Sequence, residues 1–239
     1  MTWQLKIAMG TCLLLPSLTS MARASSVTFR TEDRWNLVGE YFPPKDDGHV
    51  VILIHSLNGS RNEWKDLGER LRGLGLGTLA FDLRGYGEST QSPYGRQDYG
   101  GLTERDWRDT VKDVDAAVAF LEEKEIPEDR VALVGSVVGA NIASMASMTH
   151  PAAAWMILLS PSNDYHGLSA GSGGGMDTLL IAGTDDPDAM AICRRLAGES
   201  SHTFYIARKG GRGIAVFKDQ KFLEQVLGWV RREEKNGAR

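Results

Sequence analysis

The sequence predicts an α/β domain with a doubly wound, mostly parallel sheet and an antiparallel strand pair at its N-terminal end. Strand-like and helix-like segments alternate along the chain, which favours this fold class. Residues 50–55 form an apolar run that is typical of a strand buried on both faces. Residues 107–121 carry apolar side chains at helical spacing. A length of 239 residues suits one domain of this kind.

The strands are expected in the following order. Segments 27–29 and 36–42 are predicted to pair antiparallel, and a turn rich in Pro, Asp and Gly at 43–48 follows them. The apolar run at 50–55 comes next. The later strands are expected at 78–81, 131–134, 155–159, 179–182 and 203–206.

Helices are predicted where capping residues precede an apolar stripe. Ser60–Glu63 and Thr103–Asp106 both have the form of a capping box. The first would open a helix after Ser60, and the second would open the periodic helix at 107–121. Further helices are expected at 138–149, from Pro187 onward, and around 223–230. The glycine-rich segments 84–102 and 169–175 are expected to be loops.

The first 24 residues are predicted to be an export signal, which leaves residues 25–239 as the domain. An apolar stretch at 7–15 follows a lysine, and Ala22-Arg23-Ala24 has the small-x-small form of a signal-peptidase site. The stretch is shorter than the ~20 residues of a spanning helix. We therefore expect a periplasmic or extracellular protein with no stable membrane span after cleavage. An uncleaved anchor and a lipidated Cys12 are the alternatives.

Composition limits the classes of partner. The formal charge is −4 and no basic run stands out, so we expect no nucleic-acid partner. Cys193 would be the single cysteine left after cleavage, and its apolar surroundings in sequence predict a buried core residue.

Several glycine-containing motifs occur in an order that resembles the α/β-hydrolase superfamily of serine esterases, lipases and peptidases. The resemblance covers about residues 30–232, and it implies a sheet of the α/β-hydrolase type. The motifs are His55-Ser56-Leu57-Asn58-Gly59-Ser60, Phe81-Asp82-Leu83-Arg84-Gly85-Tyr86-Gly87-Glu88-Ser89, Gly135-Ser136-Val137-Val138-Gly139, Gly183-Thr184-Asp185-Asp186-Pro187 and Gly210-Gly211-Arg212-Gly213.

The resemblance implies a nucleophile position that this chain has substituted. The family's Gly-x-Ser-x-Gly turn exposes a serine on a sharp bend between strand and helix. Here the glycines are Gly135 and Gly139, and Val137 holds the nucleophile position. Ser136 is one residue early, and we expect its side chain to point away from the site because successive strand residues face opposite ways.

The implied base is also substituted, whereas the implied acid remains. Arg212 stands where the family has its histidine, and a guanidinium is not a general base near neutral pH. Asp186 follows a predicted strand at the position of the acid, with Asp185 as the adjacent alternative. Asp186 would also make a good helix N-cap before Pro187. We expect Arg212 and Asp186 to form an ion pair through two hydrogen bonds.

The oxyanion-binding groups implied by the resemblance are the backbone amides of Leu57 and Val138, which side-chain substitutions do not remove. Ser56 replaces the glycine that usually follows the family's histidine at that loop. His166 follows the strand at 155–159 and is either a residue near the site or an ordinary surface-loop histidine.

Three functional hypotheses follow. The first is a catalytically inactive homologue that binds a small, anionic ligand or a protein partner, and it needs no cofactor and no metal. The second is an active ester or acyl hydrolase that uses Ser136 or Ser56 with His166 and Asp186. The third is a structural or interaction module whose pocket has collapsed.

Overall fold

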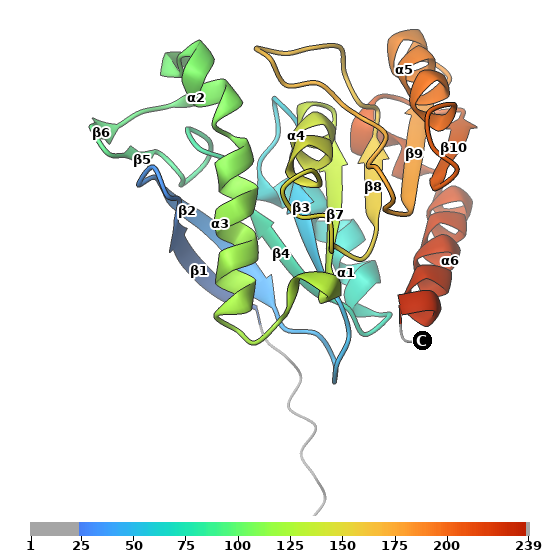
Figure 1. Cartoon of the computed structure of the whole chain (residues 1–239), viewed down its shortest axis with the longest axis horizontal. Coiled ribbons are helices and arrows are strands. Elements are labelled where there is room, and N and C mark those ends of the chain that lie inside the picture. The colour runs from blue at the N-terminus through green and yellow to red at the C-terminus, as the bar shows by residue number, and fades with distance from the viewer. Residues whose placement is uncertain (1–23, 238–239) are drawn as a thin grey trace, which may run out of the picture.

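The computed structural model describes residues 24–237, and its centre is one mixed sheet (Figure 1). The strand order is β10-β9-β8-β7-β3-β4-β2-β5-β6, with β1 paired to β2. The strands are β1 (Ser25–Arg30), β2 (Asn36–Phe42), β3 (Val50–Ile54), β4 (Gly77–Phe81), β5 (Gln91–Ser92), β6 (Gly95–Arg96), β7 (Val131–Ser136), β8 (Met156–Leu159), β9 (Thr178–Gly183) and β10 (Thr203–Arg208).

The pairing confirms the predicted fold class. Strands β3, β4, β7, β8, β9 and β10 run parallel to one another, and β4 pairs antiparallel with β2 on its other side. Strands β1 and β2 form the expected antiparallel pair, with Ser25 opposite Tyr41 and Arg30 opposite Asn36. Strand β3 is buried along its whole length, as its apolar sequence requires.

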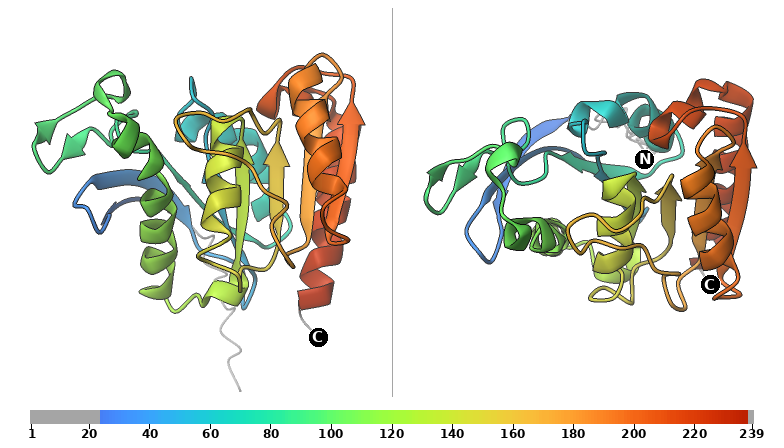
Figure 2. Two further views of the ribbon diagram at one scale, coloured as in Figure 1. Left: turned by 45° about the horizontal axis from the view of Figure 1, so that its top comes forward. Right: turned by 90° about the horizontal axis from the view of Figure 1, so that it is seen from above.

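Helices cover both faces of the sheet (Figure 2). Successive side chains of a strand point to opposite faces of the sheet, so alternate residues belong to two separate hydrophobic cores. Val51 and Leu53 of β3 pack with α1 (Lys65–Arg72) and α6 (Gln220–Gly237). Ile52 and Ile54 belong to the core beneath α3 (Val111–Glu122), α4 (Val138–Ala146) and α5 (Pro187–Ala197).

Of the two predicted capping boxes, the one at Thr103 forms and the one at Ser60 does not. Thr103 and Asp106 form the expected reciprocal pair at the start of α2 (Glu104–Arg108). That helix ends at Arg108, so the predicted periodic helix is two helices, α2 and α3. Ser60 does cap the 3₁₀ turn η1 (Arg61–Trp64), but it accepts from Asn62, and the carboxylate of Glu63 bonds to the earlier loop instead.

Other boundaries shift by a few residues. The predicted loop at 84–102 contains the β5–β6 hairpin and the 3₁₀ turn η2 (Tyr99–Gly101). Two further 3₁₀ turns are η3 (Glu128–Arg130) and η4 (Gly213–Lys218). Residues 1–23 of the predicted signal lie outside the described residues. Within 24–237, no helix is long and apolar enough to cross a membrane.

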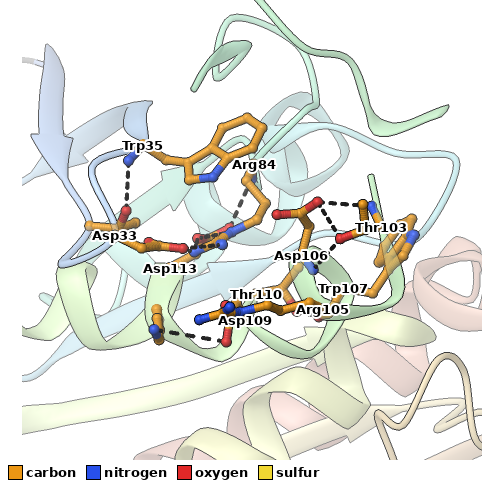
Figure 3. A network of polar contacts seen from close by, with 12 residues as sticks. Asp33, Trp35, Arg84, Thr103, Arg105, Asp106, Trp107, Asp109, Thr110 and Asp113 are labelled. Carbon is orange, nitrogen blue, oxygen red and sulfur yellow. Dashed lines mark hydrogen bonds and ion pairs between the residues drawn. The ribbon is translucent and has the colours of Figure 1, made fainter. Parts of the chain in front are cut away.

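A buried ion cluster fixes the loop after β4 to α3 and to the β1–β2 turn (Figure 3). The backbone N and the Nε of Arg84, a fully buried residue, donate to the carboxylate of Asp113 at 2.8 and 2.7 Å. Its terminal nitrogens donate to Asp33 at 2.7 and 3.1 Å. Burial alone would lower the pKa of the Arg84 guanidinium, but the charge and hydrogen bonds of the two carboxylates outweigh burial and raise it. The cluster therefore holds three segments together at the edge of the sheet.

Candidate functional site

Val137 occupies the bend between β7 and α4. Its backbone angles are φ 56° and ψ −111°, which are a strained conformation for a β-branched residue. The flanking glycines explain why the bend survives. A Cβ on Gly135 would lie 2.2 Å from the carbonyl oxygen of Gly139, and one on Gly139 would lie 2.3 Å from that of Ile54. We call this sharp bend between β7 and α4, residues 135–139, the elbow. It is present here with the aliphatic side chain of Val137 at its apex.

The loop after β10 lies directly on this bend. A Cβ built on Gly213 would approach the Oγ of Ser136 to 2.5 Å and the Cγ2 of Val137 to 3.1 Å. The Gly213 backbone, at φ +59°, lies in the left-handed region that favours glycine. Its N–H donates to the Oγ of the fully buried Ser160 at 2.8 Å. The loop that carries Arg212 is therefore anchored to the ends of β7 and β8.

Ser136 lies under the loop that carries Arg212. Its Oγ is the atom nearest to a Cβ built on Gly213, because the loop after β10 crosses back over the end of β7. This hydroxyl is buried and has no hydrogen-bond partner within residues 24–237. Ser160 was missed altogether, although its position after a parallel strand could have marked it as a residue at this edge.

Arg212 and Asp186 face each other across the site. The Arg212 Nε lies 3.5 Å from the Asp186 Oδ2, which meets the distance of an ion pair. The expected pair of hydrogen bonds is absent from the described structure, since this Oδ2 has no hydrogen-bond partner there. The other carboxylate oxygen accepts from the Ala189 N–H at 3.2 Å and caps α5. Asp186 is buried and Asp185 is exposed, so Asp186 is the inward-facing acid of the two.

The Glu63 carboxylate and the His55 imidazole hold the loop at Ser56. The Ser56 N–H and Oγ donate to the two oxygens of the Glu63 carboxylate at 2.9 and 2.8 Å. Burial raises the pKa of Glu63, and its hydrogen bonds from Ser56 act in the opposite direction. On the other side, the Leu83 N–H donates to the Nε2 of His55 at 3.0 Å. The imidazole then carries its proton on Nδ1, which donates to the Ser56 carbonyl at 2.8 Å.

The two amides implied by the resemblance lie on rigid elements. Val138 is the first residue of α4 and is buried, and Leu57 is half-buried in the braced loop. Neither the Leu57 N–H nor the Val138 N–H donates to a protein acceptor among residues 24–237. The N-terminus of α4, where the Val138 N–H lies, favours negative charge.

His166 makes its contacts with residues of α2. Its Nδ1 lies 2.6 Å from the Glu104 carboxylate, and its ring stacks on Trp107 at 5.6 Å between ring centroids. No hydrogen bond in the described part of the chain joins His166 to Ser136, Ser56 or Asp186. The structure therefore does not bring the alternative catalytic groups together.

A groove lies between α1 and η4, on the face of the sheet that α1 and α6 cover. Its volume is about 590 Å³, and its wall includes Glu63, Leu67, Ile214, Ala215 and Phe217. Glu63 belongs to the brace of the Ser56 loop, and Ile214 follows the glycine that sits on the elbow. No cluster of histidine, cysteine and carboxylate side chains suited to a metal ion occurs within residues 24–237.

Several hydrolases are among the solved structures that share this fold. The esterase Pf2001 of Pyrococcus furiosus superimposes with a TM-score of 0.69 at 17% identity, over 89% of this chain and 92% of that one. The α/β hydrolase GrgF of Penicillium sp. sh18 gives a TM-score of 0.71 at 16% identity, over 89% and 99% of the two chains. The dienelactone hydrolase of Anabaena variabilis gives 0.65 at 18% identity, over 87% and 95%.

Sequence comparison gives the family. The uncharacterized protein Rv2307c of Mycobacterium tuberculosis H37Rv is 32% identical over 151 residues, which are 62% of this chain and 49% of that protein. The chain thus spans about half the length of the curated relatives that it matches. The family model described as "Serine aminopeptidase, S33" matches residues 45–209, a range that includes Val137 and Asp186 and ends before Arg212. The chain therefore belongs to the serine aminopeptidase S33 family of the α/β-hydrolase superfamily.

Proposed function

We propose that the chain is a non-hydrolytic member of this family that binds a small carboxylate at the substituted site. The observation that carries the proposal is Val137 at the apex of an intact elbow. Valine has no lone pair to attack a carbonyl carbon, and Arg212 cannot accept a proton near neutral pH. The site keeps groups that bind an anion and lacks groups that attack and transfer protons.

The size of the expected loss in turnover favours a binding role over slow catalysis. Loss of the nucleophile or the base of a serine triad lowers turnover by about 10⁶-fold, and loss of both adds little because they act as a unit. The oxyanion hole and substrate binding alone retain about 10³-fold over the uncatalysed reaction. Such a rate is too slow for a working hydrolase.

The anion specificity is inferred from the groups that converge on the elbow. The Arg212 side chain is 54% exposed, and it approaches Asp186 with its Nε at 3.5 Å. Its terminal nitrogens can therefore bind a carboxylate bidentately. The backbone N–H groups of Leu57 and Val138 would donate to a second anionic oxygen of the ligand, as oxyanion donors do. The groove beside Ile214 and Phe217 would receive an apolar portion of the ligand.

The experiment has a catalytic arm and a binding arm. In the first, the purified protein is assayed with short and medium p-nitrophenyl esters. We expect turnover at background, and a value above about 1 s⁻¹, within the usual enzyme range, would overturn the proposal. In the second, calorimetry with small carboxylates compares the parent with Arg212→Ala. Arg195 of α5 is 56% exposed and pairs with Glu199, so Arg195→Ala is a control of matched charge and exposure.

The two arginine variants make the binding result decisive. We expect Arg212→Ala to weaken binding by about tenfold or more, as for the loss of a charge-assisted contact, and Arg195→Ala to leave it unchanged. Equal affinities of the parent and Arg212→Ala would show that Arg212 is not the ligand anchor.

A fluorophosphonate label tests the alternative of an active hydrolase with relocated groups. Labelling that is lost in Ser56→Ala or Ser136→Ala would identify a relocated nucleophile and contradict the proposal. We expect no labelling, because the Ser56 Oγ donates to a carboxylate and the Ser136 Oγ is enclosed beneath Gly213.

We further propose that the protein acts outside the cytoplasm, on the strength of the signal-like residues 1–24. Signal-dependent secretion of a fusion to an extracytoplasmic reporter tests that proposal.

A further inference from the structure

A cavity separate from the elbow lies between α1 and the strands β2 and β4. Its volume is about 330 Å³, and its lining, taken from residues 24–237, includes neither the elbow nor Asp186 and Arg212. The apolar part of its wall consists of Phe42, Leu53, Trp64 and Ala80. Its rim carries four charged side chains, which are Glu40 of β2 and Lys65, Glu69 and Arg72 of α1. The cavity thus combines apolar and charged walls.

The four charged groups of the rim are not paired with one another or with other described residues. Within residues 24–237, no ion pair includes any of them. Arg61 also lines the cavity, but its guanidinium is already paired with Asp82 and Glu88. The rim therefore offers two cations and two carboxylates to a bound molecule. A ligand that carries one charge of each sign would be complementary to it.

Arg72 is held in a fixed position at this rim. Its Cζ lies over the ring of Phe42, 3.8 Å from the centroid, and its Nη1 donates to the hydroxyl of Thr78 at 3.4 Å. Burial lowers the pKa of Arg72 and outweighs the opposing effect of the Glu69 and Glu40 charges. The guanidinium is therefore undercompensated, and the carboxylate of a ligand would supply the missing charge.

Gly68 gives this guanidinium its place. It is an interior residue of α1, where glycine is unfavourable for a helix. A Cβ built on Gly68 would lie 2.9 Å from the Nη1 of Arg72. An alanine at this position would therefore displace the guanidinium from Phe42 and Thr78. The helix glycine thus has a structural reason, which is the placement of Arg72 along the wall of the cavity.

We propose that this cavity binds a small zwitterion, an α-amino acid with an apolar side chain. The carboxylate of the ligand contacts Arg72, and its ammonium group contacts Glu69. These residues are three positions apart on one face of α1, a rise of about 4.5 Å, which suits two charges on neighbouring atoms of a small molecule. The ligand side chain lies in the apolar part of the cavity. A volume at the small end of the range for ligand pockets favours a molecule of this size.

Isothermal titration calorimetry with L-leucine tests the site. The titrated protein is the full chain with Arg212→Ala, so that the carboxylate site proposed at the elbow contributes little. We expect a Kd of about 0.1–1 mM for L-leucine, as for a good ligand with few atoms. The comparison compounds are isocaproate, which lacks the ammonium group, and isoamylamine, which lacks the carboxylate. Each should bind about tenfold more weakly than L-leucine, or weaker still, because it loses one charge-assisted contact.

Two variants in the same background test the anchor. Arg72→Gln removes the guanidinium charge, whereas Gly68→Ala keeps the charge and displaces it. Both should weaken L-leucine binding by about tenfold or more. Arg70→Gln is the matched control on the same helix, because Arg70 is 44% exposed, pairs with Glu224 and does not line the cavity. It should leave the affinity unchanged, and far-UV circular dichroism should show that all three variants keep the fold.

A further variant tests the ammonium contact. Glu69→Gln should reduce the preference for L-leucine over isocaproate, because the amide no longer distinguishes an ammonium group by its charge. Absence of L-leucine binding, or equal affinities for L-leucine and isocaproate before this substitution, would overturn the proposal. It would also be overturned if Arg72→Gln and Gly68→Ala both bound L-leucine as tightly as the Arg70→Gln control.

Discussion

The substitution Gly213→Ala tests whether the Arg212 loop is seated on the elbow as described. The added Cβ would lie 2.5 Å from the Ser136 Oγ and 3.1 Å from the Val137 Cγ2. It would also force alanine into a left-handed conformation at φ +59°. The conformation costs roughly 1 kcal/mol and the overlap about 1–3 kcal/mol. We therefore expect the free energy of unfolding to fall by about 2–4 kcal/mol, and Tm to fall by roughly 4–16 °C for a domain of this size.

Gly174 provides a matched control for the backbone contribution. It has φ +64°, and a Cβ built on it meets nothing within 4 Å. Gly174→Ala should therefore cost only the roughly 1 kcal/mol of the left-handed conformation. Urea denaturation of both variants gives the difference, which isolates the steric contact at the elbow. Equal losses of stability in the two variants would refute the seating of the loop on the elbow.

A double variant identifies the atom that Gly213 avoids. Ser136→Ala removes the nearer of the two contacts and leaves Val137 in place. In the Gly213→Ala background it should restore about 1–2 kcal/mol, a coupling typical of residues in contact. Alone, Ser136→Ala should be neutral or slightly stabilising, since the hydroxyl that it removes is buried without a partner. A coupling energy near zero would place the Gly213 loop away from Ser136.

Three further predictions concern the buried charges, the pH dependence and the chemistry. Asp113→Asn should lower the free energy of unfolding by about 3 kcal/mol, measured in urea, because it leaves the buried Arg84 guanidinium undercompensated. Burial lowers the pKa of His55 from its ordinary value of 6.5, so its contribution to stability is complete above about that pH and is lost as the pH falls. The decline in stability from about pH 7 to 5 should be shallower in His55→Gln than in the parent; an equal slope would contradict a neutral buried imidazole. The double variant Val137→Ser with Arg212→His should gain p-nitrophenyl acetate hydrolysis while each single variant stays near background, because nucleophile and base act as a unit. Activity in Val137→Ser alone that equals the double variant would contradict that reasoning.

Local sequence patterns were sufficient to predict most of the regular structure. The apolar run of β3 and the spaced apolar residues of α3 each signal their own burial, so the sheet and its covering helices could be expected in the right order. The elbow was also predictable, because Gly135 and Gly139 are needed wherever a strand turns this sharply into a helix. The ion-pair distance between Arg212 and Asp186 agrees with the expected pairing, although its geometry does not.

The side-chain contacts that could not be predicted from the sequence join segments that are distant along the chain. Glu63 had the spacing of a capping residue for Ser60, yet its carboxylate bonds to Ser56, where an N–H and a hydroxyl are both available. The burial of Ser136 beneath Gly213 depends on the path of a loop that begins after β10. The contact between His166 and Glu104 depends on where α2 lies in the fold. None of these partners is set by spacing along the chain.

The double bracing of the Ser56 loop has a thermodynamic consequence for any molecule that binds beside it. Glu63 holds the loop from one side and His55 from the other, so the Leu57 amide is already oriented before a ligand arrives. Association then need not order this segment, and the usual loss of loop entropy on binding is small. A ligand of modest size can therefore be retained with little change in the protein. Hydrogen exchange at the Ser56 N–H, which donates to Glu63, should be slow in the free protein and nearly the same in the complex.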